Sequence, residues 1–169
     1  NNGEGRALDL SARVSLDPGS YLISSSESVG LHFSSNLTMK TESEYQLSIW
    51  SIQFDDDGFA VIQANSSGGY LAVQDDVLKL SSSPMGAFSQ WAFLASAQGG
   101  YTICNVASGA VLDIAEDEVV TGAHVIAGVQ AGAMGQNWIL TNLDEQYAFM
   151  DSKARAQSAV IPSGAVIYL

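Results

Sequence analysis

The chain has 169 residues, of which 47% are hydrophobic and only 14% are charged, a composition that predicts a folded globule and argues against an intrinsically disordered chain. The net charge of −12 argues against nucleic acid or an anionic membrane surface as a partner, because both require clustered Lys and Arg. The length fits a single domain. The sequence contains no run of 18 apolar residues, so it predicts no membrane-spanning helix.

The first 18 residues form a predicted arm rather than a domain. One short alternating piece, residues 7–10, could supply an edge strand, and Asp17-Pro18-Gly19 is a turn signal that ends the arm. The start at Asn1, without Met, is interpreted as a processed or trimmed end. Two glycosylation sequons, at Asn36 and Asn65, favour a secreted protein over a cytoplasmic one.

Residues 19–143 contain three copies of one pattern. The three tryptophans, Trp50, Trp91 and Trp138, are 41 and 47 residues apart (91 − 50 and 138 − 91), a period typical of repeat architectures. Each tryptophan closes a unit in which three short apolar runs are separated by Gly, Ser, Asn or Asp turns. The predicted runs are residues 19–23, 30–33 and 37–41, then 58–62, 69–73 and 77–80, then 100–103, 109–114 and 125–129. Twelve strands are therefore predicted, in repeats of about 19–56, 57–97 and 98–143.

Residues 144–169 form a predicted C-terminal extension. Asp144–Ser158 is the least strand-like segment and is expected to hold a helical turn, whereas residues 159–169 are apolar and β-branched. An apolar edge of this kind promotes aggregation when it is left bare. We therefore expect the extension to pack on the arm, on the barrel or on a partner chain.

With its repeats aligned, the chain resembles the ricin-B-like (Q-x-W) family of β-trefoil lectins, particularly the disulfide-free lectins of fungi. The third repeat carries the resemblance through Leu112-Asp113, Gly122–Ile126 and Gln136-Asn137-Trp138. The resemblance implies an all-β β-trefoil that binds a glycan or glycoprotein without catalysis and without a cofactor. It also implies that the three tryptophans belong to the core, where large aromatic side chains contribute most.

The family places its sugar-binding carboxylate in the Leu-Asp pair, an aromatic residue late in the third run, and an Asn just before Gln-x-Trp. In the third repeat Asp113 and Gln136 match this pattern, whereas the aromatic and Asn positions fall on Gly128 and Gly135. In the first two repeats the Leu-Asp position is assigned to Leu31-His32 and Leu71-Ala72, and the Gln position to Ser48 and Ser89. The candidate carbohydrate-binding residues are therefore Asp113, His124, Gln130, Gln136 and Asn137.

Each candidate also has a structural interpretation. Asp113 can cap neighbouring backbone amides, as short acidic side chains do, and His124 can be an exposed strand-end residue. Gln136 can hold the turn of its own repeat. The run Glu116-Asp117-Glu118 is interpreted as a solvated loop.

Enzyme chemistry has no support in the sequence. Two histidines, His32 and His124, fit no zinc motif, and no nucleophile motif or phosphate-binding loop is present. The single cysteine, Cys104, lies in an apolar run and is expected to be a buried hydrophobe rather than a nucleophile.

A second function fits the same fold: a trefoil that has lost its sugar site and acts on a protein, as a protease inhibitor or an accessory subunit. The missing aromatic and the apolar C-terminal extension favour this alternative. A lectin predicts a polar pocket with an aromatic wall near Asp113, whereas the alternative predicts a large exposed apolar patch near the extension.

Overall fold

The computed structural model describes residues 9–144 of the chain, which contain twelve β-strands and five short 3-10 helices. The strands are β2 (Gly19–Ser25), β3 (His32–Phe33), β4 (Met39–Lys40), β5 (Ile49–Phe54), β6 (Ala60–Ala64), β7 (Tyr70–Gln74), β8 (Val77–Ser81), β9 (Trp91–Ala95), β10 (Tyr101–Asn105), β11 (Val111–Ile114), β12 (Val125–Gly128) and β13 (Trp138–Asn142). The 3-10 helices are η1 (Leu10–Ala12), η2 (Glu42–Ser48), η3 (Gly86–Ser89), η4 (Ala115–Asp117) and η5 (Met134–Gln136).

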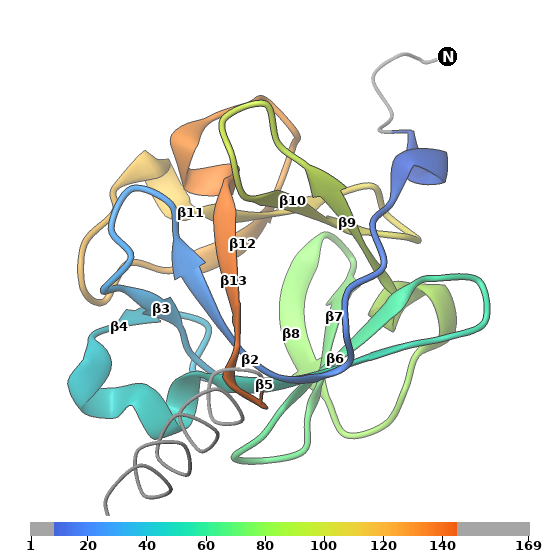
Figure 1. The fold of residues 1–169 in the computed structure, drawn as a ribbon, viewed down its shortest axis with the longest axis horizontal. Coiled ribbons are helices and arrows are strands. Elements are labelled where there is room, and N and C mark those ends of the chain that lie inside the picture. Colours follow the sequence, from blue (N-terminus) through green and yellow to red (C-terminus); the bar gives the residue numbers. More distant parts are fainter. Residues whose placement is uncertain (1–8, 145–169) are drawn as a thin grey trace, which may run out of the picture.

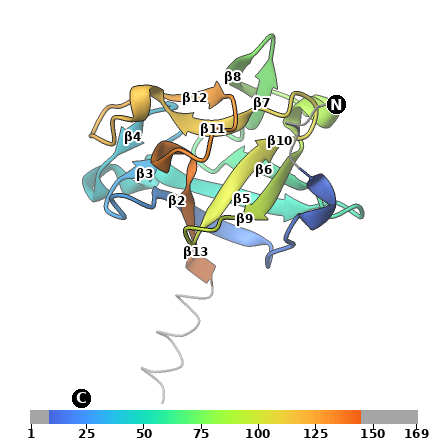
Figure 2. The same cartoon turned by 90° about the horizontal axis from the view of Figure 1, so that it is seen from above.

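Six of the strands close into a barrel through antiparallel pairs, in the order β2, β5, β6, β9, β10, β13 and back to β2. The other six form the hairpins β3–β4, β7–β8 and β11–β12. Figure 1 shows the three four-strand units in sequence order around a common centre. In Figure 2 β7, β8, β11 and β12 gather at one end of the molecule, away from β9 and β13. This arrangement is the predicted all-β β-trefoil.

The three tryptophans anchor the three units in the same way. Trp50, Trp91 and Trp138 are fully buried in the core. Each indole Nε1 donates a hydrogen bond to a backbone carbonyl in the second strand of its own unit. The acceptors are the carbonyl oxygens of Phe33 at 2.8 Å, Leu71 at 2.9 Å and Leu112 at 3.0 Å. The prediction that the tryptophans are core residues is confirmed.

These hydrogen bonds correct the sequence alignment of the first repeat. Since Phe33 occupies the position of Leu71 and Leu112, the residue equivalent to Asp113 is Ser34, not His32. Strand register agrees, because His32 pairs with β2 as Val111 pairs with β10. The glycine before Leu31 led the sequence alignment to place the run two residues too early.

The arm and the extension are described only in part. Val14 of the arm forms a single bridge with Phe93 of β9, and residues 10–12 form η1 rather than part of a strand. The predicted segments at residues 1–8 and 145–169 lie outside the described residues. Within residues 9–144, no helix has the length and apolar character needed to cross a membrane.

The tight turn between β9 and β10 supplies a test of backbone packing. Gly99 and Gly100 both have a positive φ, of +81° and +86°. A Cβ added at Gly99 has no heavy atom within 4 Å, whereas a Cβ added at Gly100 lies 2.6 Å from the Trp138 carbonyl oxygen. A non-glycine residue in this left-handed region costs about 1–2 kcal/mol. We expect Gly99→Ala to lower the free energy of unfolding by about that amount.

Gly100→Ala is expected to cost about 1–3 kcal/mol more than Gly99→Ala, since backbone atoms must move to relieve the overlap. Urea denaturation of the two variants measures the difference. Equal losses would show that the close approach of the turn to β13 is not needed for stability.

Candidate functional site

Asp113 and Gln136 of the third repeat are held together by hydrogen bonds. Asp113 lies in β11, and Gln136 ends η5, the turn that precedes Trp138. Gln136 Nε2 donates to Asp113 Oδ2 at 3.2 Å and to the Val129 carbonyl at 2.8 Å, while Gln136 Oε1 accepts from the Ala131 amide at 2.9 Å. Gln136 is only 4% exposed. Its hydrogen bonds hold the loop that contains Val129 and Ala131 and orient the Asp113 carboxylate.

The electrostatic setting of Asp113 makes its charged form less favourable. Partial burial raises the pKa of the Asp113 carboxyl above the ordinary value of 3.8. The hydrogen bond from Gln136 opposes this rise in the pKa, and the nearby negative charge of Asp117 adds to it. Within residues 9–144 no donor pairs with Asp113 Oδ1. Since Asp113 is only partly buried, this oxygen can accept a further hydrogen bond.

The two glycines that replace the expected aromatic and Asn leave room that acidic side chains occupy. An added Cβ at Gly128 would overlap Asp113 Oδ2, which means that the carboxylate lies directly over this glycine. At Gly135 the backbone amide donates to Asp117 Oδ1 at 2.7 Å. Asp117, interpreted from the sequence as part of a solvated loop, thus fixes the turn that carries Gln136.

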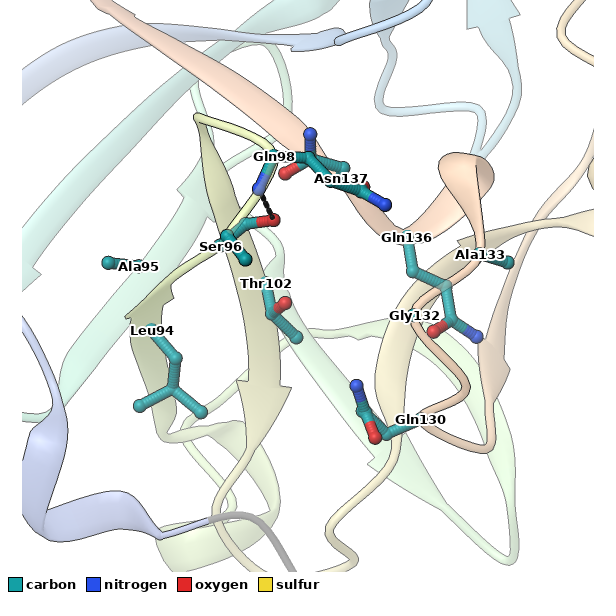
Figure 3. Close-up of a pocket in the computed structure, with 11 residues that line it drawn as sticks. Leu94, Ala95, Ser96, Gln98, Thr102, Gln130, Gly132, Ala133, Gln136 and Asn137 are labelled. Carbon is teal, nitrogen blue, oxygen red and sulfur yellow. Dashed lines mark hydrogen bonds between the residues drawn. The ribbon is translucent and has the colours of Figure 1, made fainter.

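A cavity of about 250 Å³ lies between the β9–β10 turn and the loop that precedes β13. It is lined by Leu94, Ala95, Ser96, Ala97, Gln98, Thr102, Gln130, Gly132, Ala133, Gln136 and Asn137, none of which is charged. Figure 3 shows Leu94, Ser96 and Thr102 on one side of this space and Gln130, Gly132 and Gln136 on the other.

The structure therefore brings four of the five predicted site residues together and leaves His124 apart. Gln130, Gln136 and Asn137 line the cavity, and Asp113 joins them through the Gln136 amide. His124 is exposed, its carbonyl accepts from the Ala115 amide, and among residues 9–144 no hydrogen bond links its side chain to the other four. Sequence reasoning missed Gln98 and Thr102, because they come from β9–β10 and carry no motif.

The described residues offer little for metal or thiol chemistry. Among residues 9–144 no group of three His, Cys, Asp or Glu side chains could hold a metal ion. Cys104 is buried, as the sequence predicts, and burial raises the pKa of its thiol to about 11. A thiol with this pKa is protonated at neutral pH and is not a nucleophile.

The family model described as ricin-type beta-trefoil lectin domain-like matches residues 87–163, slightly less than half of the chain. The chain is similar to the ricin-type β-trefoil lectins. The matched segment contains the whole third repeat, with both Asp113 and Gln136. No curated protein sequence matches the chain.

Solved structures share the β-trefoil fold with this chain at low sequence identity. The designed 3-fold symmetric protein ThreeFoil is 22% identical with a TM-score of 0.67, over 73% of this chain and 99% of that one. SeviL bound to asialo-GM1 saccharide is 21% identical with a TM-score of 0.61, over 75% and 98%. The Rhizoctonia solani agglutinin is 16% identical with a TM-score of 0.61, over 78% and 99%. These identities establish the fold alone.

The same fold also occurs as one part of much longer proteins. This chain spans 17% of a mosquitocidal holotoxin and 28% of a GH43 β1,3 galactosidase, with TM-scores of 0.69 and 0.65. The fold of this chain therefore occurs both as a separate protein and as one part of a longer chain.

Proposed function

We propose that this chain is a carbohydrate-binding module that recognises a glycan at Asp113 in the third repeat and performs no catalysis. The observation that carries the proposal is the carboxylate itself. Asp113 is half-buried, is oriented by Gln136, and keeps one oxygen without a partner among the described residues. A carboxylate in this state can accept hydrogen bonds from two neighbouring sugar hydroxyls, and hydrogen bonds to charged groups are the stronger kind.

The other two repeats lack this acceptor. The equivalent residues are Ser34 and Ala72, both fully buried. Ser89, at the Gln136 position of the second repeat, is also buried, and its hydroxyl bonds only to its own turn. The proposed module therefore has one glycan site of this type within residues 9–144, which favours weak binding unless several copies act together.

An aliphatic surface takes the place of the aromatic wall expected near Asp113. Ile126 is paired with Asp113 across β11 and β12, so both side chains lie on the same side of the hairpin. Ile126 is 41% exposed and Val129, whose carbonyl binds Gln136, is 85% exposed. These side chains can cover the apolar C–H face of a sugar while the carboxylate binds its hydroxyls.

A protein-binding trefoil without a sugar site is the second candidate. Its support is the loss of the aromatic and Asn positions at Gly128 and Gly135, together with exposed apolar side chains on the same repeat. A partner bound through the C-terminal extension, a secreted location and a fungal, disulfide-free type all stay predictions.

A glycan-array screen of the protein beside Asp113→Ala tests the proposal. We expect binding to a defined glycan class that is lost in Asp113→Ala and kept in Asp56→Ala, a control that removes an exposed carboxylate from the end of the first repeat. Binding that survives Asp113→Ala would move the site to another surface. An array that stays blank for all three proteins would favour the protein-binding trefoil.

A further inference from the structure

We propose that the glycan site at Asp113 extends into the cavity beside it, and that the sugar residue bound there is uncharged and carries hydroxyl or acetamido groups. This inference rests on the proposed function, because the cavity supplies the second subsite of a glycan whose first residue is held by Asp113. The module would then recognise at least a disaccharide.

Gln136 connects the two subsites. The same side chain that donates to Asp113 Oδ2 at 3.2 Å also lines the cavity wall, and Gln130, the next residue after Val129, lines it as well. The Gln136 side chain therefore links the carboxylate to the cavity wall. The Oε1 and Nε2 atoms of Gln136 already have hydrogen-bond partners within the protein. Gln136 therefore acts as a wall shared by the two subsites rather than as the main contact to the ligand.

The cavity lining matches a neutral sugar. Gln98, Gln130 and Thr102 provide neutral donors and acceptors, while Leu94 and Ala133 provide apolar contacts. None of the lining residues carries a charge. An anionic sugar would lose water there without gaining a cationic partner, and the net charge of −12 opposes its approach.

Asn137 supplies a binding group that the fold does not use. It is 4% exposed, its side chain makes no hydrogen bond within residues 9–144, and its Oδ1 is fully buried without a partner. A buried polar atom left unpaired destabilises the folded state, and such atoms are rare in folded proteins. Since Asn137 lines the cavity, a sugar hydroxyl or acetamido N–H can provide the missing partner after a small rotation of the amide.

The size of the cavity limits what can enter. Its volume of about 250 Å³ lies just below the range of roughly 300–1,000 Å³ found for drug-sized ligands. It can therefore take one sugar residue, and a longer glycan would leave the cavity into solvent.

Calorimetric titration of the full chain tests the extension. The probes are methyl hexosides, the matching neutral disaccharides, and the same disaccharides bearing a terminal sialic acid. We expect a neutral disaccharide to bind at least 10-fold more tightly than its monosaccharide, and the sialylated probe to lose this advantage. Ala133→Phe places a ring in the cavity and should reduce the ratio to about one, whereas Ala87→Phe, at an exposed alanine of the second repeat, should leave it unchanged.

The outcomes separate this inference from the proposed function. A wild-type ratio near one, or a ratio unchanged in Ala133→Phe, would overturn the extension while leaving recognition at Asp113 in place. Disaccharide binding that is lost in Ala133→Phe but kept in Asp113→Ala would contradict both. If Ala133→Phe does not fold, as judged by its thermal unfolding, Gln98→Ala replaces it and should lower the ratio by several-fold.

Discussion

Trp138→Ala is expected to lower the free energy of unfolding by about 3–5 kcal/mol, the usual cost of removing a fully buried large aromatic side chain. The truncation also leaves the Leu112 carbonyl without its indole donor. Domains of this kind are stable by only about 5–15 kcal/mol, so the variant should unfold at a much lower urea concentration. Trp50→Ala and Trp91→Ala should have similar effects, since all three indoles make equivalent bonds.

Two further variants separate packing from hydrogen bonding. Trp138→Phe keeps an aromatic ring but loses the N–H donor, so we expect a smaller loss of roughly 1–3 kcal/mol. Phe88→Ala removes an aromatic side chain that is 47% exposed and should change stability by less than about 0.5 kcal/mol. A Trp138→Ala variant no less stable than Phe88→Ala would disprove the role of the tryptophans as anchors.

Glycan binding is expected to fall by roughly 10- to 100-fold in Asp113→Asn at neutral pH, because each hydrogen bond to a charged group contributes about 1.5–3 kcal/mol. The wild type should show the same loss as pH falls through the pKa of Asp113, which burial places above 3.8. Binding measured by calorimetry should therefore fall toward that of Asp113→Asn as the pH is lowered from 7 to 4. Asp56→Asn, which removes the same charge from an exposed position, should keep the wild-type profile.

Protonation of Asp113 should raise the free energy of unfolding, whereas it should weaken glycan binding. Since the folded-state pKa of Asp113 is raised, ionisation of this carboxyl disfavours the folded state above that pKa and has no effect below the unfolded value of 3.8. Asp113→Asn should therefore be no less stable than the wild type at pH 7 in thermal unfolding. A variant that loses both binding and stability would instead indicate a structural carboxylate.

The repeats and the barrel could be predicted from the sequence because their determinants are local and periodic. Trp50, Trp91 and Trp138 mark the fourth strand of every unit, and glycines mark the turns between runs. The misplacement of Leu31-His32 arose where β3 has only two residues, which is too short for its alternation to fix the register. The indole bond to Phe33 settles that register.

The candidate site was only partly accessible to sequence reasoning. Asp113 and Gln136 could be found because they belong to a spaced motif, and the structure brings them into contact. Gln98 and Thr102 approach Asn137 only through the closure of β10 on β13, a long-range contact that no local pattern encodes. The hydrogen bond from the Gly135 amide to Asp117 depends on the positive φ of Asp117, which is 57°. The residue types around Asp117 do not predict this backbone conformation.

The indole N–H groups bind backbone carbonyl oxygens, so these bonds hold the barrel independently of the side chain proposed to bind a glycan. Every amino acid supplies a carbonyl, so the indole hydrogen bond does not depend on the side chain that follows the acceptor, which is Ser34, Ala72 or Asp113 in the three units. Under the proposed function, mutation of Asp113 would remove recognition while all three indole bonds and the barrel persist. A triplicated chain of this design can therefore change or lose a binding residue in one unit without needing a new fold.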